Sequence, residues 1–196
     1  MYFRFDAILF DLGGTLWEAS GGKPRDKIVR NAAMRAAQAI LGTTRETELA
    51  ERLSLAIVHR MNAPRIARER ANSSSYSDEI FAEDDIGSIL EAAASPFGGK
   101  IAPDITLEFG HDLTRDDANY PETVAVLKRI RETRPEIRIG IVSNTVVQPE
   151  VIDFHLARTG LLELVDFRVL SSELGWRKPH PAIYAAALAK SPMNMI

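Results

Sequence analysis

The chain of 196 residues contains no cysteine, which excludes a disulfide framework and any metal site built from thiolates. Its hydrophobic content of 45% suffices for one core plus an inserted module, but hardly for two large independent domains. The 24 Lys and Arg are spread among 27 Asp and Glu, giving a net charge of −3, so we expect neither nucleic acid nor an anionic membrane as a partner.

The N-terminal residues and the lack of long apolar stretches predict a cytoplasmic protein. Asp6 and Asp11 interrupt the apolar residues near the N-terminus, so the sequence has no usable signal-peptide core. No segment approaches the roughly 18 apolar residues that a membrane span requires. The absence of cysteine also fits a reducing compartment.

The first predicted element is a strand over residues 7–10, a continuous apolar run of the kind that is buried on both faces of a parallel sheet. It ends at Asp11, and Gly13, Gly14 and Thr15 follow. Open α/β folds bind ligands at the carboxyl edge of the sheet, so we expect Asp11 at a binding site. The glycines allow a tight turn and the close approach of a ligand. The alternative is that Asp11 only caps a turn.

Residues 18–119 show helical patterns and no strand pattern, which predicts an insertion between the first strand and the remaining α/β sequence. We expect helices from about Asp26 to Gly42, from about Thr47 to Arg60 and around residues 77–94, and then a less regular piece through Pro103. The apolar positions expected on the first two helices are Ile28, Ala32, Ala36 and Ile40, then Leu49, Leu53, Ala56 and Ile57. A basic run contains candidates for holding an anionic substrate tail, with a solvated helix face as the alternative: Arg65, Arg68 and Arg70.

From Tyr120 onward the sequence alternates between helix and strand. The expected elements are a helix over 121–133, a strand over 137–142, a helix over 148–158, a strand over 167–170 and a helix over 181–190. This order predicts a parallel sheet with right-handed crossovers. We therefore expect an α/β core of residues 1–17 and 120–196, and a helical domain of residues 18–119 that closes over the edge carrying Asp11.

Polar groups of three kinds follow the three predicted strands: Asp11, then Ser143 with Asn144, and Lys178 in the loop after the third strand. The carboxyl ends of parallel strands share one edge, so these groups can converge on one pocket. A carboxylate can attack phosphorus, a hydroxyl can hold a phosphoryl oxygen and an ammonium group can balance charge, which together suit phosphoryl transfer. Taken singly, Ser143 and Asn144 also fit a helix cap, and Lys178 also fits a surface turn.

Three segments together resemble the first three motifs of the haloacid dehalogenase-like hydrolase superfamily: residues 10–16 (FDLGGTL), 141–144 (IVSN) and 175–184 (GWRKPHPAIY). The resemblance implies an α/β fold with a Rossmann-like parallel sheet core and an inserted all-helical cap over residues 18–119. It also implies a hydrolase, in the first place a Mg²⁺-dependent phosphomonoesterase that works through an aspartyl-phosphate on a small phosphorylated metabolite.

The resemblance also implies roles for single residues. Asp11 would be the nucleophile, and Lys178 would steady the transferring group. Mg²⁺ would be held by Asp11 and by the backbone carbonyl of Gly13. The residues implied to shape the nucleophile loop or to bind the transferring group are Thr15, Ser143 and Asn144.

The sequence departs from the superfamily pattern in two places. Phosphatases carry a second Asp two residues after the nucleophile as general acid and base, but this position is Gly13, and losing such a group typically costs about 10²–10⁴ in rate. The fourth motif, Gly-Asp followed by a further acid, does not occur before Ile196, so we expect the last core strand to be missing and the first strand to be an exposed edge. Two alternatives therefore stay open: a 2-haloacid dehalogenase-type hydrolase, or a truncated or non-catalytic protein with this fold.

Other polar and aromatic residues carry weaker signals. No metal-binding spacing links the histidines, for which we expect surface or packing roles: His59, His111, His155 and His180. A solvated hinge is the simplest interpretation of three acids before Tyr120, namely Asp112, Asp116 and Asp117. Trp17 and Trp176 flank the pocket loops. They either line the pocket or pack the helical domain against the core.

Overall fold

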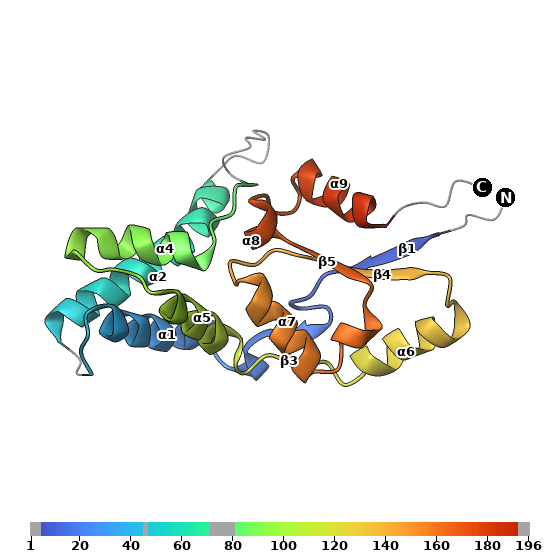
Figure 1. The fold of residues 1–196 in the computed structure, drawn as a ribbon, viewed down its shortest axis with the longest axis horizontal. Helices are drawn as coiled ribbons and strands as arrows, with labels where there is room; N and C mark the ends of the chain where they lie inside the picture. The colour runs from blue at the N-terminus through green and yellow to red at the C-terminus, as the bar shows by residue number, and fades with distance from the viewer. Residues whose placement is uncertain (1–4, 45–46, 71–80, 192–196) are drawn as a thin grey trace.

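The computed structural model of the protein describes residues 5–44, 47–70 and 81–191, without the side chains of residues 64–70. Figure 1 shows two halves, a small parallel sheet with helices on both faces and a group of helices beside it. The described helices of this group are α1 (Arg25–Ile40), α2 (Glu48–Arg70), α4 (Ile86–Ala94) and α5 (Pro103–Thr114). Within the described ranges, no helix has the length and apolar character to cross a membrane.

The main sheet is parallel, and its described strands lie in the order β1-β4-β5. The predicted strands are confirmed to within one residue: β1 is Ala7–Phe10, β4 is Arg138–Ser143 and β5 is Phe167–Leu170. Pairing of Phe10 with Ile141 and of Ser143 with Leu170 aligns the three strand ends at one edge. The expectation that β1 is buried on both faces is wrong, because β1 is an edge strand of the described sheet and Leu9 is 39% exposed.

Alternating side chains of β4 separate the core of this half into two layers, because successive residues of a strand point to opposite faces. Ile139 belongs to the same buried cluster as Leu156, whereas Val142 packs with Ile183 on the other face. Figure 1 shows the helices of the two layers on opposite sides of the sheet. These helices are α6 (Thr123–Thr133) and α7 (Pro149–Arg158) in the first layer and α9 (Pro181–Lys190) in the second.

Helix α1 is the centre of the helical half, where it packs against both α2 and α5. Its buried face consists mainly of small side chains, which let the neighbouring helices approach closely, and comprises Val29, Ala32, Ala33, Ala36 and Ala37. The expected face is therefore only partly correct. Ile28 and Ile40, which we placed on it, are half-buried at its margins.

Two sequence expectations for this half are wrong. Leu49 is 45% exposed, and its neighbour Ala50 is buried instead. The helix expected around residues 77–94 is interrupted by a non-helical piece over 82–85, after which α4 begins at Ile86, while residues 71–80 lie outside the described chain. The less regular piece expected through Pro103 is found before α5, which begins at Pro103 itself, because proline is well suited to the first turn of a helix.

A short antiparallel pair of strands joins the two halves, although the sequence showed no strand pattern there. β2 (Trp17–Glu18) pairs with β3 (Ala118–Asn119), so the chain leaves and re-enters the sheet half through hydrogen-bonded neighbours. Thr123 Oγ1 and the Tyr120 amide both donate to the Leu16 carbonyl, at 2.9 and 3.2 Å. Short helical segments complete the described chain: η1 (Ala19–Gly22), η2 (Ser95–Phe97), η3 (Leu162–Leu164) and α8 (Ser171–Leu174).

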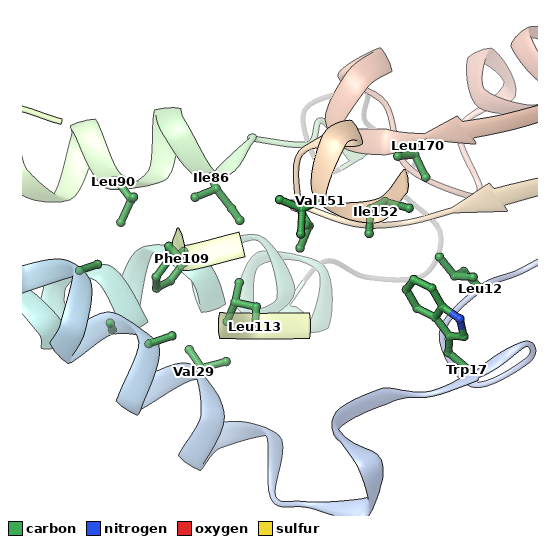
Figure 2. Packing of buried hydrophobic residues seen from close by; sticks show 14 of the residues in the cluster. Leu12, Trp17, Val29, Ile86, Leu90, Phe109, Leu113, Val151, Ile152 and Leu170 are labelled. Atoms are coloured by element: carbon green, nitrogen blue, oxygen red, sulfur yellow. The ribbon is translucent and has the colours of Figure 1, made fainter. Parts of the chain in front are cut away.

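One hydrophobic cluster runs through both halves. Figure 2 shows it extending from Leu90 and Phe109 in the helical half, past Ile152 of α7, to Leu12 and Trp17 beside the first strand. The two halves therefore share buried apolar surface and are not merely tethered.

Candidate functional site

Asp11 and Lys178 are in direct contact where their strands end. Lys178 Nζ lies 2.8 Å from Asp11 Oδ1 and donates to the Val142 carbonyl at 2.8 Å. The Leu12 amide donates to the same carboxylate oxygen at 2.8 Å. No hydrogen bond or ion pair within the described chain uses Asp11 Oδ2, and the side chain is 43% exposed. This oxygen is thus available to attack an electrophile that enters from solvent.

Asn144 holds the backbone of Lys178 in place. The Lys178 amide donates to Asn144 Oδ1 at 2.7 Å, and Asn144 Nδ2 donates to the Lys178 carbonyl at 3.2 Å. This reciprocal pair ties the loop after β4 to the loop after β5. Asn144 therefore positions Lys178, a role that the sequence did not indicate.

The loop after β1 is closed by a bridge between Gly13 and Trp17. The Trp17 amide donates to the Leu12 carbonyl at 2.9 Å, and the Gly14 amide donates to the Trp17 carbonyl at 2.7 Å. Gly14 has a φ of 79°, in the left-handed region that favours glycine. Gly13 has no such requirement, because its φ lies outside that region and a Cβ there would meet no atom within 4 Å.

Two adjoining cavities connect the strand ends with the helices. The small cavity, of about 180 Å³, is lined by Gly13, Ser143 and Asn144 among others. The large cavity, of about 410 Å³, is lined by Met61 and Asn62 of α2. The two cavities have four lining residues in common, namely Arg25, Asn144, Thr145 and Val147.

The structure does not bring every predicted residue to this place. Thr15 is exposed and lines a separate cavity of about 320 Å³ with Phe10 and Tyr120. Arg25, the first residue of α1, is a cation on both cavities that the sequence did not single out. The side chains of three predicted tail-binding residues lie outside the described part of the chain: Arg65, Arg68 and Arg70.

The two tryptophans have different surroundings. Trp17 is 3% exposed and lines the small cavity, and its Nε1 is buried without a hydrogen-bond partner among the described residues. Trp176 stacks on His180, with ring centroids 4.2 Å apart. Only Trp17 therefore lines the cavity formed by the strand ends.

A buried ion pair connects the helical half to the loop that precedes Lys178. Arg177 Nη1 lies 2.9 Å from the carboxylate of Glu83, whose side chain is 1% exposed. Ser171 Oγ donates to the same carboxylate at 2.9 Å. Backbone bonds from Glu83 to Gly175 and from Arg177 to Phe81 flank the pair at 2.9 Å. A lone Glu in the sequence carried no signal of this contact.

The three acids that we expected to form a solvated hinge have different surroundings. The expectation is wrong for Asp117, which is buried. Asp117 is 7% exposed, lines the small cavity and accepts a hydrogen bond from the Ser20 amide at 2.6 Å. Asp112 pairs with Arg35 and Arg115, and Asp116 pairs with Lys23. Burial raises the pKa of the Asp117 carboxyl above its ordinary value.

The donor set at Asp11 fits a magnesium ion only in part. Within the described ranges, no three His, Cys, Asp or Glu side chains gather into a group that could hold a metal ion. The bridge in the loop uses the Leu12 carbonyl and the Gly14 amide, so the Gly13 carbonyl is not part of it. Mg²⁺ usually keeps several waters and takes one or two carboxylates plus substrate phosphates. Asp11 supplies the one carboxylate that this pattern requires.

Comparisons with known proteins agree with this arrangement. The family model of haloacid dehalogenase-like hydrolases matches residues 5–192. A HAD-hydrolase, YfnB, from Bacillus subtilis, solved with magnesium bound, is 13% identical, covers 97% of this chain and 74% of its own, and has a TM-score of 0.51. No curated protein matches the sequence.

Two further solved structures have the same fold but different activities in their names. A HAD phosphatase from Thermococcus onnurineus is 21% identical, with coverage of 95% and 71% and a TM-score of 0.52. A 2-haloacid dehalogenase from Pseudomonas syringae pv. tomato is 21% identical, with coverage of 96% and 73% and a TM-score of 0.55. Such low identities establish the fold alone, but the family model spans nearly the whole chain. This protein therefore belongs to the haloacid dehalogenase-like hydrolases.

Proposed function

We propose that this hydrolase is a Mg²⁺-dependent phosphomonoesterase that acts on a small phosphorylated metabolite, with Asp11 as its covalent nucleophile. The observation that carries the proposal is the contact of Asp11 Oδ1 with Lys178 Nζ at 2.8 Å, which orients the carboxylate and leaves Oδ2 open. Lys178 is in turn held by Asn144. A carboxylate that is fixed but not saturated suits attack on phosphorus.

The residues of the chain would share the reaction as follows. Asp11 Oδ2 attacks phosphorus, and the bond from phosphorus to the leaving oxygen breaks. Lys178 offsets the negative charge shared by the carboxylate and the phosphoryl oxygens. Ser143, which lines the small cavity, is available to donate a hydrogen bond to one of these oxygens. Water then cleaves the aspartyl-phosphate and restores Asp11.

Mg²⁺ would be held by Asp11 and the Gly13 carbonyl, with water and substrate oxygens as its other ligands. When bound, it supplies neutralisation of charge on the phosphoryl oxygens.

We further propose that residues 18–119 form a helical cap and that the large cavity receives the organic part of the substrate. Arg25, Met61 and Asn62 of this region line that cavity beside Asn144 of the sheet half. Arg177 of this lining is paired with Glu83, whereas Arg25 donates to the Leu113 carbonyl and forms no ion pair with a described carboxylate of the large cavity. A substrate with polar or weakly anionic groups near the phosphate suits this lining.

A second candidate function is hydrolysis of a 2-haloacid. Two observations favour it. The first is that Gly13 provides no acid for the leaving group, and a departing halide needs none. The second is Trp17 Nε1, a buried donor on the small cavity that has no partner among the described residues, and such a donor can bind a halide. Release of halide from a small 2-haloacid, independent of added metal, would favour this function over phosphate ester hydrolysis.

Substitution of the nucleophile tests the main proposal. We expect Asp11→Asn to lose phosphate release from 4-nitrophenyl phosphate almost completely, because an amide cannot form the acyl-phosphate. The matched control is Asp104→Asn, which alters an exposed acid in the first turn of α5. Rates are measured with Mg²⁺ and with chelator, and thermal unfolding is recorded for each variant.

If the Asp11→Asn variant were as active as the parent, Asp11 would be excluded as the nucleophile. A parent chain that binds phosphate but never turns over a phosphate ester or a haloacid would support the remaining alternative, a non-catalytic protein of this fold.

A further inference from the structure

An alkyl phosphate needs a proton for its leaving oxygen, and the loop after Asp11 supplies no acid because position 13 is glycine. Resting on the proposed function, we propose that Asp117 is the general acid and base of this reaction, acting from across the small cavity. The acid would therefore come from the junction between the two halves and not from the nucleophile loop.

The small cavity is the first support for this assignment. Asp117, Gly13 and Ser143 all line it together with Leu12, the residue after Asp11, and its volume of about 180 Å³ is sufficient for a phosphoryl group. Asp117 is 7% exposed, so the cavity is its route to a ligand. Among the described lining residues of this cavity, Asp117 is the one with a carboxyl group.

Hydrogen bonds hold both the side chain and the backbone of Asp117. The side-chain Oδ1 accepts from the Ser20 amide at 2.6 Å, and the backbone carbonyl accepts from Arg158 Nη2 at 3.1 Å. Ser20 itself has a φ of 69°, a left-handed conformation that is unusual for a non-glycine residue. This arrangement fixes Oδ1, so Oδ2 is the oxygen available to carry and transfer a proton.

The surroundings of Asp117 raise the pKa of its carboxyl and so favour the protonated form. Burial, the largest influence, raises the pKa of its carboxyl, and the adjacent Asp116 acts in the same direction. Arg25 of α1 and Arg158 of α7 oppose the rise, as does the Ser20 amide. The net change is upward, which favours the protonated acid that the first step requires.

Protons and bonds balance in both steps. In the first, Asp11 Oδ2 bonds to phosphorus, the bond to the leaving oxygen breaks, and the Asp117 carboxyl gives its proton to that oxygen to form an alcohol. In the second, water bonds to phosphorus and gives a proton to the Asp117 carboxylate. The bond from phosphorus to Asp11 then breaks, which releases phosphate and restores both residues.

Asp117 also has a structural role as the acceptor for Ser20, so the test variant must preserve that bond. Asp117→Asn has the same shape and keeps an oxygen acceptor for the Ser20 amide. Asp104→Asn again serves as the control, since it alters an exposed acid of α5 that does not line the small cavity. Thermal unfolding of both variants establishes that each remains folded.

The two steps respond differently to the quality of the leaving group. With an alkyl phosphate, we expect Asp117→Asn to lose about 10²–10⁴ in kcat, because both steps lack their proton carrier. With 4-nitrophenyl phosphate, whose leaving group needs no proton, we expect a burst of one product per enzyme followed by slow turnover. The burst should coincide with phosphorylation of Asp11, detected by mass spectrometry of the peptide that contains it.

A compensating variant provides a second, independent readout. Because a Cβ at position 13 has open space, Gly13→Asp can introduce an acid within the nucleophile loop. In the background of Asp117→Asn, we expect Gly13→Asp to restore turnover of the alkyl phosphate. A purely structural role for Asp117 would not be rescued by a carboxylate at another position.

The outcomes separate this inference from the proposed function. If Asp11→Asn is inactive but Asp117→Asn hydrolyses an alkyl phosphate at the parental rate, Asp117 is not the acid and the proposed function stands. If Asp11→Asn retains parental activity, both are overturned. Loss of alkyl turnover with a burst on the aryl ester, and rescue by Gly13→Asp, supports Asp117.

Discussion

At the scale of single residues, His155 is a histidine that stays neutral inside the protein. It is 2% exposed, with Arg158 Nη2 2.9 Å from Nδ1 and Thr114 Oγ1 2.8 Å from Nε2. An arginine can only donate, so Nδ1 accepts and the proton resides on Nε2, which donates to Thr114. Burial is the main cause that lowers the pKa of His155 to about 4, and the neighbouring Arg158 and His111 add to it.

This lowered pKa predicts a loss of stability in acid. Below the ordinary His value of about 6.5 the unfolded chain takes up a proton that the native protein refuses until about pH 4. The free energy of unfolding should therefore fall by about 1.4 kcal/mol per pH unit from this residue, or about 3 kcal/mol in all, between pH 6.5 and pH 4. Urea unfolding at several pH values measures the slope.

The contribution of His155 is isolated by comparison with His155→Gln, which does not titrate in this range. The variant should be less stable at pH 7, where the native histidine is satisfied, but its stability should fall less steeply as the pH decreases. Parallel pH profiles for the two proteins would contradict the neutral, buried state.

At the scale of elements, the Glu83–Arg177 pair links the strand-like piece before α4 to the loop that carries Lys178. Ala82 and Trp176 form a bridge beside it, and Ser171 Oγ connects it to the Thr145 amide at 2.8 Å. Loops after two different strands thus meet at one carboxylate from the helical half. Removal of one partner would leave the other charge buried and unpaired.

We expect Glu83→Leu to lower the free energy of unfolding by about 3–5 kcal/mol, the usual effect of breaking a buried pair. The double variant Glu83→Leu/Arg177→Leu should lose less than the sum of the two single variants, because it leaves no unpaired charge. Urea unfolding of the four proteins measures the difference. Additive effects would mean that the two side chains act separately.

At the scale of the whole molecule, the continuous hydrophobic cluster predicts that the two halves unfold together. Trp17, Phe109 and Ile152 belong to one cluster, although they come from the junction, the helical half and the sheet half. Exposing either half would expose apolar surface of the other, which opposes a state with only one half folded.

We therefore expect a single unfolding transition in urea. Its midpoint should be the same by tryptophan fluorescence, which follows Trp17 at the junction and Trp176 in the loop before Lys178, and by far-UV circular dichroism, which follows the helices of both halves. Two separate transitions would indicate that residues 18–119 fold independently of the sheet.

The sequence alone determined the parallel sheet and the order of polar groups along it. The three strands were predicted from the local composition of residues 7–10, 137–142 and 167–170. A polar residue follows each of them, either directly or in the next loop. Because parallel strands align their ends, the order of these groups predicted that Asp11 and Lys178 can share one edge, and the structure shows their contact at 2.8 Å. Hydrophobic patterns are local properties of the sequence, so strands and helices can be predicted from them without a structure.

Contacts between distant segments were decided only by the tertiary structure. Asp117, Arg25 and Glu83 are ordinary charged residues in the sequence, and nothing local indicates that the first two line a cavity or that the third is buried. Strands β2 and β3, of two residues each, form because the two crossings of the chain lie side by side. Such roles depend on which segments the fold brings together, and no periodicity in a single stretch of sequence records that.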